Sequence, residues 1–391
     1  MTPAWRLVVA GALALGIGLG IGRFFYTPML PLMQQEYGFD PAVAGLIASA
    51  NFAGYLAGSL AGSLLRPGPV RLQAFRIGLV ISALSTLAMG MTDDVTAWLV
   101  LRAIGGIASA FVMIAVAAFV AEALAPVSET GRIAWMFSGV GFGIALSGLL
   151  TEFFGSQVSS STMWYIAGGL CVLALPFVLA EMGDRTLQAS PKRPHRRRRE
   201  PRPLPLVPLL INYTCEGLGY SVFATFIVAI IKSRPELAHI GDWSWVIVGL
   251  TGVPSMLLWA AAAERIGYAV ALAVAFAVQI VGVLLPAFSD SGGVALLAAA
   301  LFGATFMSIT MLTLPLGRHG AGGRGFAILT AGWGAGQMIG PLVTGYMVTA
   351  GYDYHMALVA SAAVLGFGLV VLLAAMAFRG PGVASDGRSA A

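Results

Sequence analysis

Twelve stretches of this chain are each long and apolar enough to cross a lipid bilayer. A helix needs about 20 mostly apolar residues to span the hydrocarbon core. Such stretches lie at 7–33, 42–64, 73–91, 96–123, 133–154, 162–182, 205–231, 243–263, 267–288, 293–317, 325–349 and 354–378. A soluble domain carries about a quarter charged residues, whereas this chain is 10% charged and 58% hydrophobic. The sequence therefore predicts an all-α membrane protein with twelve transmembrane helices that contact the lipid bilayer.

Basic residues are distributed unevenly between the two ends of these helices. If the first helix starts in the cytoplasm, only Lys232 and Arg234 fall in loops on the far side. The near side then holds eighteen basic residues: Arg6, Arg66, Arg71, Arg76, Arg132, Arg185, Lys192, Arg193, Arg196 to Arg199, Arg202, Arg265, Arg318, Arg324, Arg379 and Arg388. Cytoplasmic loops of membrane proteins carry such an excess. We therefore expect a bacterial inner (plasma) membrane protein with both termini in the cytoplasm.

One long hydrophilic interruption lies near the middle of the chain. It contains the run Lys192-Arg193-Pro-His-Arg-Arg-Arg-Arg199. We interpret this run as a cytoplasmic connector, the alternative being a patch that binds nucleic acid or anionic lipid. The interruption predicts a six-helix bundle over 1–182, a connector over 183–204 and a second six-helix bundle over 205–391.

Glycine-rich segments indicate that the two halves are related. SGVGFGIALSG at 138–148 aligns with AGWGAGQMIGP at 331–341, and GIGRFFYT at 20–27 aligns with GLGYSVFA at 217–224. Each pair lies in corresponding helices of the two halves. Because six crossings are an even number, the halves are expected to be parallel repeats.

Two parallel six-helix bundles joined by a basic loop resemble the major facilitator superfamily over essentially the whole chain. Arg102-Ala-Ile-Gly-Gly resembles a segment of that family's fourth helix, and the glycine run 139–148 resembles its fifth. GIGRFFYTPMLP at 20–31 and Glu216-Gly-Leu-Gly-Tyr220 are similar to its uncharacterised YbfB/YjiJ branch. The resemblance implies a transporter that exposes a central site to each side of the membrane in turn.

The segment Gly62-Ser-Leu-Leu-Arg66-Pro-Gly-Pro-Val-Arg71 resembles the superfamily's gating loop, with Arg66 where that loop has an Asp. The resemblance implies a gating role for Arg66 and Arg71. Glu122 and Arg132 lie at the facing ends of neighbouring helices, and we expect them to pair as part of the gate.

Three charged residues lie well inside predicted membrane helices. A charge near the bilayer centre costs about 2.5–3.5 kcal/mol on insertion scales, so it faces a cavity or a partner. At about 1.5 Å per residue, Glu216 is ~16 Å inside its helix, Arg23 ~24 Å from the start of the first helix, and Arg102 ~9 Å from the outer end of the fourth. We therefore expect the three side chains to approach one central cavity.

Each of the three has a functional and a structural interpretation. Arg23 could bind an anion, since a guanidinium donates two parallel hydrogen bonds to a carboxylate, or it could form an internal ion pair. Gly20, Gly22 and Pro28 would allow the helix around Arg23 to break. Arg102 could contact substrate, couple conformations or form a structural pair. Glu216 could carry a proton, because low dielectric favours a neutral carboxyl, or form a permanent salt bridge with an Arg.

Neutral polar and aromatic residues complete the predicted substrate site. Asn51 and Tyr55 share one face of the second helix, and Trp333 and Gln337 share one face of the eleventh, because each pair is four residues apart. The substrate-contacting set is then Arg23, Tyr26, Asn51, Tyr55, Arg102, Tyr220, Trp333 and Gln337, with Tyr213 and Gln279 as further polar groups.

Several classes of function lack their motifs. The sequence has no nucleotide-hydrolysing loop, no H-E-x-x-H, no catalytic triad and no paired catalytic acids. We therefore predict neither an enzyme nor a metal- or cofactor-binding protein, and no nucleic-acid partner. The expected function is a monomeric secondary transporter of a small organic anion, coupled to protons. A broad-specificity drug or metabolite exporter and, more remotely, a non-transporting membrane sensor remain alternatives.

Overall fold

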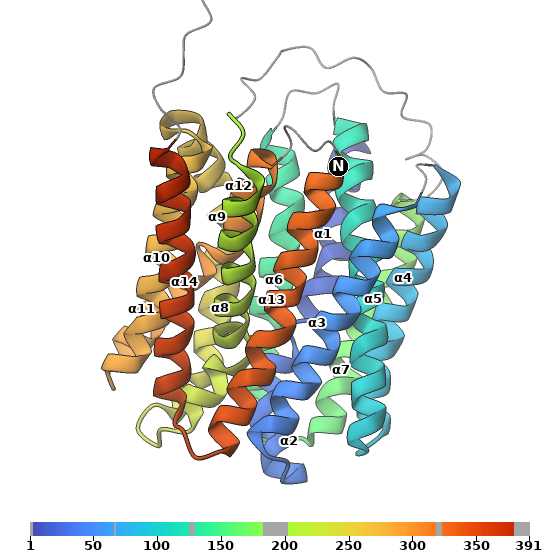
Figure 1. The fold of residues 1–391 in the computed structure, drawn as a ribbon. Coiled ribbons are helices and arrows are strands. Elements are labelled where there is room, and N and C mark those ends of the chain that lie inside the picture. The colour runs from blue at the N-terminus through green and yellow to red at the C-terminus, as the bar shows by residue number, and fades with distance from the viewer. Residues whose placement is uncertain (1–2, 66–67, 125–129, 183–201, 318–322, 379–391) are drawn as a thin grey trace, which may run out of the picture.

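The computed structural model describes residues 3–65, 68–124, 130–182, 202–317 and 323–378 (Figure 1). Over these ranges the chain consists of helices and loops, without a strand. Twelve helices in the described ranges are long and apolar enough to cross a membrane, which confirms the predicted number.

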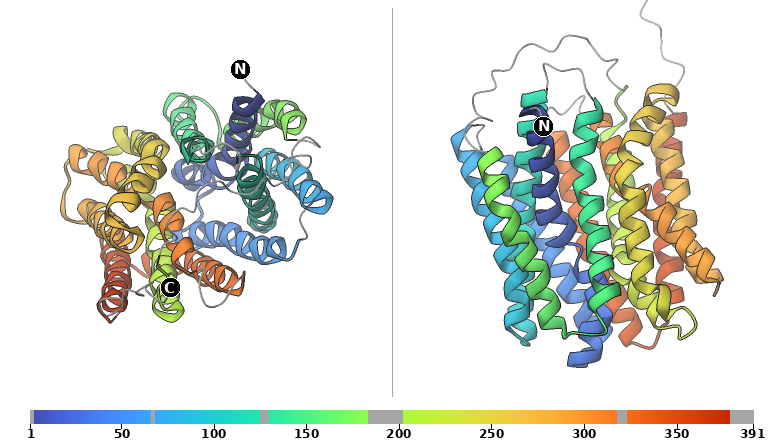
Figure 2. Two further views of the ribbon diagram at one scale, coloured as in Figure 1. Left: turned by 90° about the horizontal axis from the view of Figure 1, so that it is seen from above. Right: turned by 180° about the vertical axis from the view of Figure 1, so that it is seen from behind.

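The N-terminal half contributes α1 (Pro3–Leu15), a π-helical segment (Gly16–Ile21), α2 (Tyr26–Tyr37), α3 (Pro41–Ser63), α4 (Pro69–Ala88), α5 (Val95–Leu124), α6 (Thr130–Phe154) and α7 (Ser160–Glu181). The C-terminal half contributes α8 (Leu206–Lys232), α9 (Gly241–Ile266), α10 (Tyr268–Phe288), α11 (Gly292–Gly303), α12 (Phe306–Leu316), α13 (Gly323–Thr349) and α14 (Tyr354–Ala377). Seen from above, α1–α7 form one group and α8–α14 another (Figure 2).

Acidic and hydroxyl side chains set the start of several helices. The carboxylates of Asp40, Asp94 and Asp353 accept hydrogen bonds from the backbone N–H groups three residues further on, as does the hydroxyl of Ser159. Each bond satisfies a donor that the first turn of a helix leaves free. The acids that the sequence places in short loops therefore fix where α3, α5 and α14 begin, and Ser159 does the same for α7.

Two of the twelve membrane crossings are interrupted. The first changes from α1 to π-helix at Gly16, passes through a turn at 22–25 and resumes as α2. The sequence predicted that a break was possible there, and Arg23 lies within it. The tenth crossing breaks between α11 and α12, which was not predicted from the sequence. A Cβ on Gly303 at that break would lie 2.3 Å from the Val248 carbonyl oxygen, so α9 approaches too closely for any side chain.

The aligned glycines occupy equivalent positions in the two halves. Gly139 and Gly143 of α6 pack on the first crossing of their own half, where added Cβ atoms would meet the Ala12 oxygen and Gly20 Cα. In α13, Gly336 likewise packs on α8 of its own half. Gly141 lies between Gly139 and Gly143 and faces α9 of the opposite half. Gly334, two residues before Gly336, likewise faces α3 of the opposite half. The glycine repeat therefore marks two related packing surfaces.

The two halves are closed together at the end of the molecule that contains α2. Their most extensive contacts join α3 to α13 and α6 to α9. Hydrogen bonds cross between the halves from Ala42 N to Thr349 Oγ1 (2.9 Å), Ser49 Oγ to the Met338 oxygen (2.7 Å), Thr27 Oγ1 to the Ala224 oxygen (2.5 Å) and Trp245 Nε1 to Ser147 Oγ (3.1 Å).

Candidate substrate cavity

A cavity of about 390 Å³ lies between the two halves. It extends from Arg23 and Tyr220, deep between the halves, to Ser63, Pro315 and Phe326, where α3 and α12 end and α13 begins. Most of its wall is apolar, including Leu19, Phe24, Leu60, Met113, Ile114, Val140, Met256, Phe306, Met307 and Met311. The molecule is therefore open at this end and closed at the α2 end.

Arg23 lies at the deep end of the cavity within a group of aromatic rings. Its Cζ atom is 4.3 Å from the ring centre of Tyr55 and 4.7 Å from that of Phe52. Its Nη2 donates to the Tyr220 hydroxyl at 3.1 Å, across the boundary between the halves. The side chain is 3% exposed, and its Nε has no hydrogen-bond partner among the described residues. Rings stabilise the cation without supplying an opposite charge.

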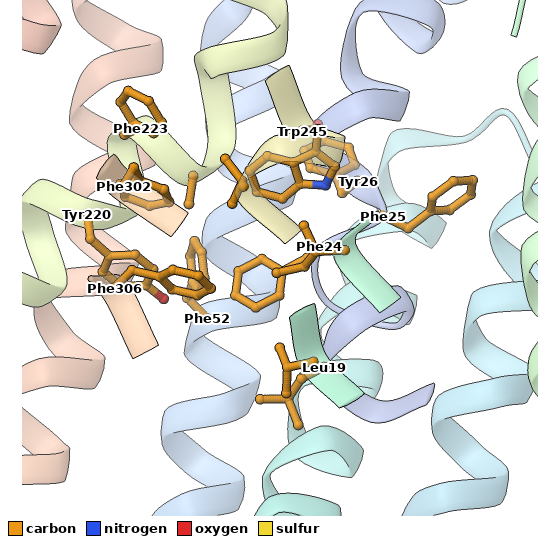
Figure 3. Packing of buried hydrophobic residues seen from close by; sticks show 14 of the residues in the cluster. Leu19, Phe24, Phe25, Tyr26, Phe52, Tyr220, Phe223, Trp245, Phe302 and Phe306 are labelled. Carbon is orange, nitrogen blue, oxygen red and sulfur yellow. The ribbon is translucent and has the colours of Figure 1, made fainter. Parts of the chain in front are cut away.

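Tyr220 and Trp333 form the C-terminal side of this site. The two rings are stacked with centres 5.7 Å apart, and Trp333 stacks on its other face against Tyr213 at 5.5 Å. The Tyr220 hydroxyl donates in turn to Gln337 Oε1 at 2.7 Å. Figure 3 shows Tyr220 beside Phe302 and Phe306, with Phe24 and Phe52 facing them from the other half.

Glu216 lies behind Trp333, away from the cavity wall. Its carboxylate is fully buried and accepts from Trp333 Nε1 and, at 3.3 Å, from Gln279 Nε2. No basic residue in the described ranges pairs with it. Of the two interpretations of Glu216 from the sequence, a permanent salt bridge is thus not present in this structure.

Arg102 points at the broken backbone of the first crossing. Its Nη1 and Nη2 donate to the carbonyl oxygens of Gly22 and Arg23 at 3.0 and 2.9 Å. Asn51 Nδ2 donates to the Arg102 carbonyl at 2.9 Å, and the centre of the Tyr26 ring lies 5.1 Å from the guanidinium carbon. Arg102 thus satisfies carbonyls that the helix break leaves without partners.

The predicted substrate-contacting residues therefore separate into two groups. Arg23, Tyr55, Tyr220 and Trp333 line the cavity, while Tyr26, Asn51, Arg102 and Gln337 lie behind its wall. Substrate contact by the second group stays a prediction. Phe52, which contacts Arg23, and Phe306, which lines the cavity, were not predicted from the sequence. No sequence signal separates an aromatic residue at a cavity from one in a packed core.

The predicted gate is only partly described. Arg71 lies in the first turn of α4, at the open end of the molecule. Arg66 and the side chains of Glu122 and Arg132 lie outside the described residues. The gating role of all four residues stays a prediction.

A family model described as uncharacterised MFS-type transporter YbfB matches residues 15–373. The chain belongs to this family of the major facilitator superfamily. As the sequence resemblance implied, it is a multi-pass membrane protein of a transporter family and not of an enzyme family.

The benzoate transport protein of Acinetobacter baylyi is 29% identical to this transporter over 188 residues. That match covers 46% of this chain and 39% of the relative, so the chain spans well under half of that protein's length. Crystal structures of the nucleoside transporter NupG share the fold. One, of a point mutant, gives a TM-score of 0.72 at 14% identity, covering 97% of this chain and 100% of NupG. Another gives a TM-score of 0.67 at 15% identity, covering 98% and 100%.

Proposed function

We propose that this transporter moves small organic anions with an apolar, aromatic body, and that protons drive the movement. The observation that carries the proposal is Arg23, a guanidinium at the deep end of a mostly apolar cavity without a carboxylate partner among the described residues. A buried charge of this kind is stabilised when an opposite charge arrives. A planar carboxylate could accept two hydrogen bonds from it.

The surroundings of Arg23 support an aromatic body for the anion. Tyr55, Tyr220, Trp333 and Phe306 present ring faces and edges to the cavity, and aromatic pairs add about 0.5–1.5 kcal/mol beyond simple burial. The similarity to a benzoate transport protein over nearly half of this chain supports the same class of substrate.

Glu216 is the proposed proton carrier. It is buried among neutral donors, namely Trp333 and Gln279, and has no fixed counter-charge in the described ranges. A carboxyl in such a setting can exist with or without its proton. Its place directly behind Trp333, one residue away from the cavity, would let protonation affect the substrate site.

We further propose that the protein lies in a bacterial inner membrane as two bundles, 1–182 and 205–391, joined by a cytoplasmic connector, with both termini in the cytoplasm. The distribution of basic residues supports this orientation. The cavity would then open to the cytoplasm, and the end at α2 would face outward.

Benzoate uptake into proteoliposomes with an imposed pH gradient tests both parts of the proposal. Arg23→Ala should weaken benzoate binding at least about tenfold, because it removes charge-assisted hydrogen bonds worth about 1.5–3 kcal/mol. Glu216→Gln should retain benzoate exchange but lose accumulation driven by the gradient. Arg265→Ala, at the exposed end of α9, is the matched control and should behave as wild type.

If Arg23→Ala binds benzoate as the wild type does, the anion site does not lie in this cavity. Gradient-driven accumulation by Glu216→Gln would show that Glu216 does not carry the coupled proton.

A broad-specificity exporter is the second candidate function. It is favoured by four methionines in the wall, since flexible Met side chains suit varied ligands: Met113, Met256, Met307 and Met311. It would be supported if a lipophilic aromatic cation were moved as well as benzoate.

A further inference from the structure

Trp333 contacts both of the sites proposed above. One edge of its indole ring lines the cavity, and the ring centre is 5.9 Å from Arg23 Cζ. The indole also carries Nε1, which donates to Glu216 Oε2. The anion site and the buried acid are therefore separated by the thickness of one side chain.

The stack around Trp333 fixes its plane but not its position within that plane. Tyr213 and Tyr220 lie on its two faces, inclined to it by 10° and 5°. Parallel rings can slide past each other at little cost, because offset stacking is favourable over a range of displacements. A substrate seated against the exposed edge could therefore move the indole relative to Glu216.

The two partners of Glu216 respond differently to a proton. An indole N–H can only donate, and it bonds more strongly to a carboxylate than to a neutral acid. Gln279 can turn its amide and present either its NH₂ or its carbonyl, and its Oε1 has no partner among the described residues. Gln279 can thus serve both forms of Glu216, whereas Trp333 favours the ionised form.

The other described groups around Glu216 do not replace Trp333 as the donor that favours its ionised form. The titratable groups that interact with it electrostatically are the phenols of Tyr213 and Tyr220 on α8 itself. Of the elements packed on α8, α13 supplies the indole of Trp333, α12 a hydroxyl at Thr310 beside Tyr213, and α14 Ser361, Leu365 and Gly368.

Charged groups on the remaining neighbours of α8 lie further from Glu216. From the N-terminal half, Arg23 reaches Tyr220 but makes no described contact with Glu216. Asp242 of α9 is paired with Lys232, and Lys232 lies about 24 Å along the helix from Glu216 at the usual helical rise.

We infer that Trp333 couples substrate to proton: an anion bound at Arg23 displaces the indole from Glu216, and the carboxylate that loses this donor takes up a proton. The inference rests on the proposed function of Arg23 and Glu216. It makes Trp333 a positioning residue for the proton carrier in addition to a wall of the cavity. Linkage then requires that protonation of Glu216 favour anion binding to the same extent.

Trp333→Phe separates these roles, because it keeps a ring in the stack and removes the N–H. The carboxyl band of Glu216 in infrared difference spectra, assigned with Glu216→Gln, reports its protonation without any substrate. In Trp333→Phe the pH midpoint of this band should rise by about one unit or more, since the lost hydrogen bond is charge-assisted. The pH optimum of gradient-driven benzoate uptake should rise with the band.

Trp164→Phe is the matched control, because Trp164 is buried and its Nε1 has no partner in the described structure. In Trp164→Phe the Glu216 band should titrate as in the wild type. A wild-type midpoint in Trp333→Phe would overturn the inference.

A second measurement needs no variant at position 333. In the wild-type protein, saturating benzoate should raise the midpoint of the Glu216 band, and Arg23→Ala should abolish that rise. An unchanged midpoint with bound benzoate would also overturn the inference. If benzoate does not bind, or Glu216→Gln still accumulates it, the proposed function fails instead, and the band shift in Trp333→Phe remains a separate result.

Discussion

Two buried arginines of the N-terminal half have different roles because their side chains contact different groups. The terminal nitrogens of Arg102 bond to the carbonyl oxygens of Gly22 and Arg23, and the side chain holds the break in the first crossing. Arg23 projects from that break into the cavity, where its described hydrogen-bond partner is the Tyr220 hydroxyl. The structure thus places Arg102 behind the cavity wall, in support of the broken helix, and Arg23 in the wall itself.

Replacing Arg102 by Met should destabilise the protein without directly removing a substrate contact. The loss of two hydrogen bonds from a charged donor should cost about 2 kcal/mol or more and lower the thermal unfolding temperature in detergent. Arg102→Lys keeps the charge but cannot make both bonds, so it should fall between Met and wild type. A Met variant with wild-type stability and abolished benzoate binding would instead identify Arg102 as a ligand contact.

At the scale of elements, contacts between helices of opposite halves depend on close backbone approach. A Cβ on Gly45 of α3 would lie 2.2 Å from the Pro341 oxygen of α13, and one on Gly345 of α13 would lie 2.3 Å from the Pro41 oxygen. Small residues permit such approach in membrane proteins, where van der Waals packing and not the hydrophobic effect holds helices together. The same contacts keep this end of the molecule closed.

Gly45→Ala should therefore favour opening at the α2 end. Overpacking costs about 1–3 kcal/mol, which corresponds to roughly a fivefold or greater rise in the open population. A cysteine at Ser49, which is 3% exposed between α3 and α13, should react correspondingly faster with a water-soluble thiol reagent. Gly169→Ala is the control, because a Cβ there meets nothing within 4 Å. Equal reactivity in both variants would show that α3 and α13 do not govern closure.

At the scale of the whole molecule, the structure is open at one end of the cavity and closed at the other. Transport by a two-bundle carrier requires the halves to rock about the central site so that the closed end opens. The hydrogen bond between Ala42 and Thr349 lies at the closed end and joins the two halves. We therefore expect this bond to break in each transport cycle.

Cross-linking cysteines at positions 42 and 349, in a background without the two native cysteines, should therefore stop benzoate transport. Binding from the open side should persist, because the cavity already exists in this conformation. A reducible bifunctional reagent allows recovery of transport after cleavage. The control places the two cysteines at positions 234 and 290, where Arg234 and Asp290 form an ion pair within the C-terminal half. This variant should transport normally when it is cross-linked. Continued transport by the 42–349 cross-link would contradict rocking at this interface.

The amino-acid sequence by itself determined the number of membrane crossings, the related glycine surfaces and the residues that are costly in a bilayer. These follow from local chemistry: a backbone in lipid must satisfy its own hydrogen bonds as helices, and a buried Arg or Glu is unfavourable wherever it points. The break near Arg23 was also foreseeable from Gly20, Gly22 and Pro28.

The tertiary structure alone decided which of these residues share the cavity. It placed Arg102 against the carbonyls of a broken helix, Trp333 between Arg23 and Glu216, and a second break at Gly303 against α9. Lipid, packed neighbours and an apolar cavity all select the same residue types. A side chain's direction therefore depends on how the helices are rotated and where the two halves meet, and this is set by contacts between residues far apart in the chain.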